Sequence, residues 1–255
     1  WHEQAVAAGD LPEYEGYGSY RLKLLLPDSG AEYRLHLRFA RSAYRCFVAV
    51  DGGEFRLLLE AGRPGRDRAA TRPVRQRLFV ELPPGRELDL VFEVANFHHG
   101  TGGLRHRPEL GLSASMDARY QNQDHRQWFS IGALMAIGLF NLSLYLLRSR
   151  EQAPLGLAGG AFAFAANIGF IHVCPMWVCE TYVDYGWLRA IEFAVLFSLP
   201  AYFVLFVYNA FPGAVPRRFM RVAVTAYALL AVFAVTATVP RLTQIYEYFA
   251  WSFVL

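Results

Sequence analysis

The stretch WFSIGALMAIGLFNLSLYLL, Trp128–Leu147, decides how the remainder of the chain can fold. It runs for twenty residues without one Asp, Glu, Lys or Arg. A helix of that length spans about 30 Å, which is the thickness of the hydrocarbon core of a bilayer. Charges resume on either side, at Arg126 and Arg148. The stretch therefore predicts a membrane-spanning helix that separates two regions of different character.

The charged residues follow the same division. Positions 1–127 hold 18 Lys or Arg and 17 Asp or Glu, whereas positions 128–255 hold only 7 and 5. The net charge of +3 comes with no basic patch of interleaved aromatic residues, so the composition does not indicate nucleic-acid binding. The sequence starts at Trp1 without a charged-then-apolar leader. We therefore expect either a cleaved signal or a start inside a longer protein.

The half before the helix alternates apolar and polar residues with a period of two between Gly16 and Asn96. Successive side chains of a strand point to opposite faces, so such runs predict strands with one apolar face. Short strands bounded by turn residues predict an all-β sandwich or jelly roll over residues 1–115. In the clearest run, the residues expected to face inward are Tyr33, Leu35, Leu37 and Phe39. The polar outward row of the same run is Arg34, His36 and Arg38.

A connector at residues 116–127 leads into an apolar region at residues 128–255. Repeated apolar segments predict an all-α, multi-pass bundle of membrane helices, of which the last stops too early to span. Within it, Asn141, Asn167 and Asn209 are expected to bond neighbouring helices. The expected spans are about 128–147, 155–173, 191–211, 221–239 and, incomplete, 245–255.

Arginine placement predicts the orientation of this bundle. Lys and Arg are enriched in cytoplasmic connectors. The connectors after the first and third segments hold five Arg between them, whereas the other two connectors hold one each, Arg189 and Arg241. The first and third connectors are therefore predicted to be cytoplasmic and the β half extracytoplasmic. The five Arg are Arg148, Arg150, Arg217, Arg218 and Arg221.

The loop NFHHGTGGLRHRPELG, Asn96–Gly111, is the candidate binding loop, with Asn96, His98 and His99 as its candidate ligand contacts. The alternative interpretation is a glycine-rich turn that closes the sandwich, and loops of this composition are common. No zinc site is predicted, because the histidines lack a Cys or acidic partner at a fixed spacing. We expect no cofactor.

Three further sets of residues carry open alternatives. Arg189 and Glu192, at i and i+3, could couple the outer domain to the bundle or form a helix-surface pair at the headgroup level. Cys174 and Cys179 could form a disulfide in an oxidising periplasm or remain thiols. Cys46 is expected to be a core residue of its strand.

The chain resembles the bacterial seven-transmembrane receptors with diverse intracellular signalling modules. GYGSYRLKLLLP (Gly16–Pro27), VDGGE (Val50–Glu54) and ANFHHGTGGL (Ala95–Leu104) resemble the extracytoplasmic jelly-roll sensor of that family, which is itself similar to sugar-binding domains. GLFNLSLYLLRSRE (Gly138–Glu151) and LRAIEFAVLFSLPAYFVLF (Leu188–Phe206) resemble its membrane helices. The resemblance spans nearly all of the chain, although four full spans and part of a fifth stand where the family has seven.

The resemblance implies a receptor in the bacterial inner membrane that senses a small ligand, such as a carbohydrate. The signal would pass to a cytoplasmic module that is missing here: a cyclase, a GGDEF domain or a histidine kinase. The expected partners are the lipid bilayer and the ligand, with a homodimer left open. The alternatives are a multi-pass transporter with an outer accessory domain and a membrane-anchored hydrolase. The hydrolase needs paired acids, and Asp89 and Glu93 are more simply a solvated strand face.

Overall fold

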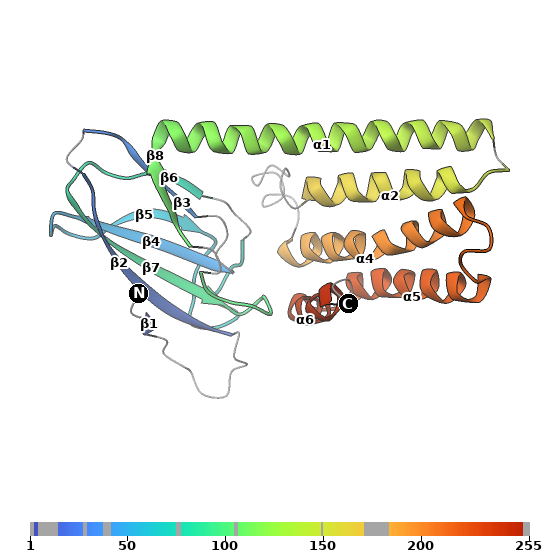
Figure 1. Ribbon diagram of the computed structural model, residues 1–255. Coiled ribbons are helices and arrows are strands. Elements are labelled where there is room, and N and C mark those ends of the chain that lie inside the picture. The colour runs from blue at the N-terminus through green and yellow to red at the C-terminus, as the bar shows by residue number, and fades with distance from the viewer. Residues whose placement is uncertain are drawn as a thin grey trace. The chain divides into compact units, whose positions relative to one another are not determined.

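The computed structural model describes residues 3–4, 15–27, 30–37, 42–74, 78–104, 107–148, 150–170 and 184–251. The chain folds into two compact units. The first consists of Trp1–Tyr120 together with Val239–Leu255, and the second of Gln121–Thr238. Strands make up most of the first unit and helices make up the second (Figure 1).

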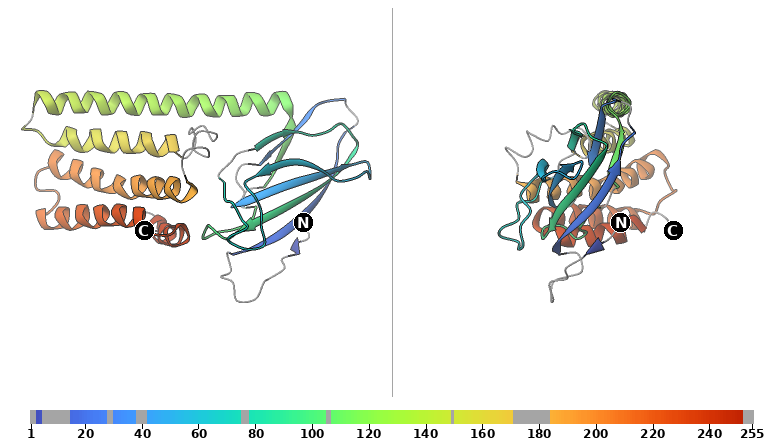
Figure 2. Two further views of the ribbon diagram at one scale, coloured as in Figure 1. Left: turned by 180° about the vertical axis from the view of Figure 1, so that it is seen from behind. Right: turned by 90° about the vertical axis from the view of Figure 1, so that its left-hand side faces the viewer.

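Two antiparallel sheets form the β part of the first unit (Figure 1; Figure 2). The larger sheet has the strand order β1-β2-β7-β4-β5 and the smaller one has the order β6-β3-β8. The larger sheet is formed by β1 (Glu3–Gln4), β2 (Gly16–Leu25), β7 (Glu87–Asn96), β4 (Ala43–Val50) and β5 (Arg56–Ala61). The smaller sheet is formed by β6 (Leu78–Glu81), β3 (Tyr33–Leu37) and β8 (Glu109–Leu112).

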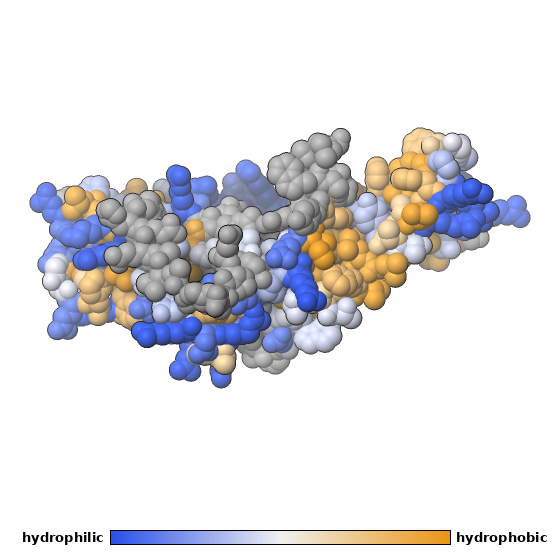
Figure 3. Space-filling model, turned by 90° about the horizontal axis from the view of Figure 1, so that it is seen from below, coloured by the Kyte–Doolittle hydropathy of each residue, from blue (hydrophilic) through white to orange (hydrophobic). Residues whose placement is uncertain are grey.

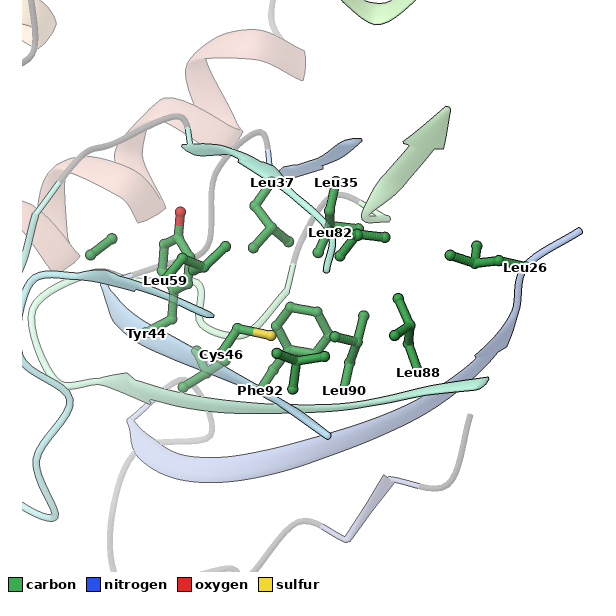
Figure 4. Packing of buried hydrophobic residues seen from close by; sticks show 13 residues of the cluster. Leu26, Leu35, Leu37, Tyr44, Cys46, Leu59, Leu82, Leu88, Leu90 and Phe92 are labelled. Carbon is green, nitrogen blue, oxygen red and sulfur yellow. The ribbon is translucent and has the colours of Figure 1, made fainter. Parts of the chain in front are cut away.

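The hydrophobic core lies between the two sheets (Figure 4). The alternation of β7 sends every second side chain inward, so that Leu88, Leu90 and Phe92 are fully buried. From the opposite sheet Leu35 and Leu37 point toward them, which confirms the predicted inward direction of these two residues. Tyr33 packs against the same core while partly buried, and Phe39 lies outside the described residues.

The polar outer row predicted for β3 is wrong at His36. This side chain is fully buried, although it faces away from the sandwich core. The reason is α1 (Ser113–Leu147), which begins directly after β8 and covers His36 with Tyr120. The sequence could not indicate this cover, because the connector at residues 116–127 reads as polar. That connector is the first part of α1. Arg38 lies outside the described residues.

Four helices belong wholly or mostly to the second unit, namely α1, α2 (Ala153–Ile168), α4 (Tyr185–Ala210) and α5 (Arg217–Thr236). Within the described residues, α1, α4 and α5 are long and apolar enough to cross a membrane, and α2 is a shorter apolar helix. Apolar side chains gather over the helices on the face that Figure 3 shows. The chain is therefore a membrane protein with a β-sheet region.

Small residues set the contact between α2 and α4. A Cβ atom at Gly156 would lie 2.8 Å from the backbone nitrogen of Phe206, so only glycine permits this approach. The prediction that Asn141 and Asn209 bond neighbouring helices is wrong. Each side chain donates instead to a carbonyl group of its own helix, four residues earlier. A carbonyl of the preceding turn is simply closer than a neighbouring helix. Asn167 is buried.

The final helix, α6 (Val239–Trp251), belongs to the unit that contains the sandwich. The sequence predicts an incomplete fifth span over 245–255, whereas the helix starts six residues earlier, at Val239. Leu242 and Thr243 in its second turn are buried. Residues 252–255 lie outside the described residues.

Candidate functional site

The candidate binding loop is closed by its own first residue. Asn96 is buried at the end of β7. Its amide nitrogen donates to the His99 carbonyl oxygen at 2.7 Å, and the His99 backbone N–H donates to its amide oxygen at 3.2 Å. This is the local side-chain-to-backbone bonding for which Asn is favoured in turns. Both ends of the Asn96 amide therefore shape the loop.

His99 connects the loop to α6. Its Nδ1 accepts a hydrogen bond from the Thr101 backbone N–H at 3.1 Å, which places the ring proton on Nε2. Nε2 lies 3.5 Å from the hydroxyl oxygen of Thr243. Because that hydroxyl donates to the Val239 carbonyl oxygen at 2.9 Å, it is free to accept from His99. Both His99 and Thr243 are buried.

The loop and α6 meet at a glycine. A Cβ atom at Gly100 would lie 2.9 Å from the Pro240 carbonyl oxygen and 3.0 Å from the Thr243 Cβ atom. Any other residue at this position would push the helix away from the loop. His98, the third candidate ligand contact, is half-buried in the same loop. The ligand roles of Asn96, His98 and His99 stay predictions, while the contacts of Asn96 and His99 lie within the loop and toward α6.

A second connection joins the small sheet to α1. The Tyr120 hydroxyl donates to the Glu109 carboxylate of β8 at 2.8 Å and also bonds the Nδ1 atom of His36 on β3. Since the hydroxyl has one proton, His36 Nδ1–H must be the donor in the second bond. The His36 ring stacks on Phe79, with ring centroids 4.3 Å apart. Three elements therefore meet at the Tyr120 hydroxyl.

Ion pairs flank this connection. Arg34 on β3 pairs with Glu81 on β6 at 2.7 Å between Nη2 and Oε1, and with Asp117 on α1. Arg119 on α1 pairs with Glu109 at 3.2 Å between Nη1 and Oε2. We call the set His36, Tyr120, Glu109, Arg34 and Asp117 the β3–α1 clamp. It fixes the first two turns of α1 on the outer face of the small sheet.

Arg189 and Glu192 form a buried ion pair near the start of α4. Arg189 Nη1 and Glu192 Oε2 are 2.6 Å apart, and the two side chains are 8% and 10% exposed. The Arg189 guanidinium also lies over the ring of Phe193, 5.2 Å from its centroid. The pair is therefore largely buried among the helices of its unit, so it does not lie open on a helix surface. Their coupling role remains a prediction.

The remaining ionisable candidates have structural roles. Asp89 accepts a hydrogen bond from Arg21 Nε at 2.9 Å, and this bond lowers the pKa of the Asp89 carboxyl. Glu93 pairs instead with Arg45 at 2.5 Å between Oε2 and Nε. Each acid therefore pairs with its own arginine across neighbouring strands. Burial raises the pKa of the Cys46 thiol to about 12, and Cys174 and Cys179 lie outside the described residues.

The residues of these contacts that the sequence did not predict are Tyr120, Glu109 and Thr243. Tyr120 and Thr243 bond histidines 84 and 144 positions away, and Glu109 bonds Tyr120 across the junction of β8 and α1. No local pattern in the sequence marks such side chains. Among the described residues, no group of three or more His, Cys, Asp or Glu side chains could hold a metal ion.

Comparison with known proteins adds little to this geometry. No protein-family model and no curated protein matches the chain. A solved structure of a Bacteroides fragilis protein, whose description proposes a beta-galactosidase, is similar at 17% identity and a TM-score of 0.28. The match covers 38% of this chain and 15% of that protein, so the chain spans a small part of its length. A likeness at this TM-score carries no argument about fold or activity.

Proposed function

We propose that this chain is the sensing and membrane part of a transmembrane receptor. Its sandwich would bind a small extracytoplasmic ligand and pass the change through the helices to a cytoplasmic output module. The proposal rests on one observation: within its compact unit the sandwich is joined to two separate helices. The β3–α1 clamp holds α1, and the Asn96–Gly103 loop holds α6 through His99 and Gly100.

Such connections suit signal transfer. An accessory domain that merely covers a transporter needs only a flexible tether, whereas a sensor must move the helices that it contacts. Strand β8 ends at Leu112 and α1 begins at Ser113, so no linker absorbs motion between them. A displacement of the small sheet relative to the large one would therefore change the positions of α1 and α6.

The strand order supports a jelly roll as the architecture of the sensor. One sheet reads β2-β7-β4-β5 and the other reads β8-β3-β6. A chain that folds as a long hairpin and then rolls up pairs its strands in this way, because β2 and β7 come from the two arms of that hairpin. The extra short strand β1 extends the edge beside β2.

The contact of α6 with the sandwich supports a count of four crossings. Because His99 bonds Thr243, the start of α6 lies on the same side of the bilayer as the sandwich. An even number of crossings must then separate Tyr120 from Val239. Since α1, α4 and α5 are three, α2 supplies the fourth, although its described part is 16 residues long. This count agrees with the arginine placement, which puts the sandwich outside the cytoplasm of a bacterial inner membrane.

A fluorescence measurement distinguishes a receptor from a transporter. The exposed residue Gln244 of α6 is replaced by Cys and labelled, with Cys174 and Cys179 replaced by Ser. The labelled protein in nanodiscs is titrated with panels of neutral sugars, amino acids and nucleosides. A receptor predicts a saturable emission change with at least one compound and no uptake of that compound into proteoliposomes. Saturable uptake, or binding without any change at Gln244, would contradict the proposal.

A further inference from the structure

Arginine is concentrated in one short segment of the first unit. Residues 62–77, GRPGRDRAATRPVRQR, hold six of the 18 Lys and Arg residues found in positions 1–127, and all six are Arg. Asp67 is the one acidic residue in this segment. The segment follows β5 and precedes β6, so it connects the large sheet to the small one. A third of the basic residues of this half therefore gather in a single connection, of which the structure describes residues 62–74.

The described part of this segment is a well-fixed hairpin. Arg63 and Arg72 exchange two backbone hydrogen bonds, with N to O distances of 3.0 Å and 2.9 Å. Farther along, the hydroxyl of buried Thr71 donates to the Asp67 carbonyl oxygen at 2.7 Å. Gly62 at the base has a φ of 67°, and a Cβ atom there would lie 2.3 Å from the Arg72 carbonyl oxygen. The backbone therefore holds the two arginines at a fixed separation.

Arg63 and Arg72 lie directly opposite one another across the hairpin. Two residues of an antiparallel pair that exchange both backbone bonds have Cα atoms about 5.5 Å apart and side chains on the same face. Both side chains are exposed, and within the described part of the chain neither guanidinium forms an ion pair. Like charges in directly opposed positions are unfavourable. The hairpin therefore keeps two mutually repelling guanidinium groups on one face.

The other charged groups of the hairpin have partners of their own. Arg68 forms an ion pair with Glu15, with 2.5 Å between Nη2 and Oε1. The Arg66 guanidinium lies over the ring of Tyr17, 5.8 Å from its centroid. The Asp67 carboxylate accepts a hydrogen bond from a backbone N–H of the same turn at 2.7 Å. An anion that approaches the opposed pair therefore meets two guanidinium groups with which no described carboxylate pairs.

The charge and geometry of this pair favour one kind of ligand group. Arg presents a planar fork of N–H donors, so two opposed arginines offer two forks and two positive charges. A carboxylate has one negative charge and two oxygens in one plane, and a single fork satisfies it. A phosphomonoester has close to two negative charges at pH 7 and three acceptor oxygens. It can therefore bond both forks and balance both charges.

We propose that Arg63 and Arg72 form a binding site for a dianionic phosphate group, either a phosphomonoester or inorganic phosphate. The inference goes beyond the proposed receptor function and does not depend on it. Two sources share this chemistry, namely a small soluble phosphate compound and a lipid with a phosphomonoester headgroup, such as phosphatidic acid. Ligand binding would remove the repulsion between the two guanidinium groups, so the bound hairpin is more stable than the empty one.

The binding test uses the full chain in phosphatidylcholine nanodiscs. Inorganic phosphate, glycerol 3-phosphate and acetate are titrated by calorimetry at constant ionic strength. The blocking variant is Arg63→Gln with Arg72→Gln. The matched control is Arg56→Gln with Arg86→Gln, which removes two exposed arginines outside the hairpin that form no ion pair in the described ranges. We expect phosphate to bind at least about tenfold more weakly to the blocking variant, acetate to bind at least about tenfold more weakly than phosphate, and the control to match the wild type.

A stability measurement tests the premise of opposed charges. Without phosphate, the blocking variant should melt no lower than the control variant, because it loses a repulsion. Phosphate should raise the melting temperature of the wild type and leave that of the blocking variant unchanged. A blocking variant that melts below the control would give the pair a stabilising role and overturn the proposal.

Hydrogen exchange over residues 62–74 identifies the source of the phosphate group. Slower exchange of the wild type in nanodiscs with phosphatidic acid than with phosphatidylglycerol assigns the lipid, and slower exchange only with glycerol 3-phosphate assigns a soluble compound. The blocking variant should show neither effect. The proposal is overturned if phosphate does not bind, if acetate binds equally well, or if both double variants lose the same affinity.

Discussion

Gly100 and Pro240 approach so closely that a Cβ atom at Gly100 would lie 2.9 Å from the Pro240 carbonyl oxygen. The two residues are 140 positions apart in the chain. The loop has the composition of a binding loop, but in the structure it packs closely against α6.

The Gly100→Ala substitution should therefore loosen α6. The added methyl group must displace either Pro240 or Thr243, so the hydrogen bond between His99 and Thr243 lengthens or breaks. We expect faster hydrogen exchange over residues 239–246 in the variant. Gly18→Ala is the matched control, because a Cβ atom at Gly18 meets nothing within 4 Å. Equal exchange in the two variants would contradict the contact.

Removing the Tyr120 hydroxyl should destabilise the β3–α1 clamp. Tyr120→Phe retains the ring contacts with His36 and Phe79 but leaves buried His36 and the Glu109 carboxylate without that hydroxyl. We expect the free energy of unfolding to fall by about 1–3 kcal/mol, measured by chemical denaturation of the full chain. In the control Tyr17→Phe, the ring that faces Arg66 is kept, and we expect little change.

The Arg189–Glu192 pair should show the asymmetry of buried charges. Glu192→Gln removes the carboxylate that pairs with Arg189 and should destabilise the helical unit by about 3 kcal/mol or more. The double substitution Arg189→Met with Glu192→Leu removes both charges and should cost much less. Thermal unfolding in nanodiscs compares the three proteins. If the double variant melts below Glu192→Gln, the pair contributes a net stabilisation and the expectation is wrong.

The Cys46 thiol should resist alkylation in the folded protein. Burial raises its pKa to about 12, so at pH 8 only about one thiol in ten thousand is ionised. A maleimide should modify it only after denaturant is added, with Cys174 and Cys179 replaced by Ser. The raised pKa of Cys46 also makes the stability of the fold depend on pH. The folded state keeps the proton that the unfolded chain loses above about pH 8.5, so stability falls as the pH rises beyond that value.

The proposed four crossings put Gln244 of α6 and Arg218 at the start of α5 on opposite sides of the membrane, because α5 alone crosses between them. Gln244→Cys on α6 and Arg218→Cys at the start of α5 are both exposed positions. In intact cells a membrane-impermeant thiol reagent should label Gln244→Cys and spare Arg218→Cys. The reverse pattern would invert the topology, and labelling of both or neither would contradict a crossing by α5.

Much of this fold follows from local pattern. A period of two predicts the strands and the inward direction of Leu35 and Leu37, and uncharged runs predict the long helices. The burial of His36 does not follow from its own strand, because it depends on Tyr120, 84 positions later. The roles of His99 and Gly100 depend likewise on α6. Composition alone could indicate that the Asn96–Gly103 loop approaches something closely, but the partner is set by tertiary packing.

Strand β8 ends at Leu112 and α1 begins at Ser113 without a linker, so the rotation of α1 about its axis is fixed by the small sheet. A helix turns by about 100° and advances by about 1.5 Å with each residue. One residue inserted between Tyr120 and Trp128 would therefore rotate the whole membrane segment of α1 against the sandwich, while seven residues would nearly restore the original facing. A foreign domain joined to this helix would have to match its rotational phase as well as its length.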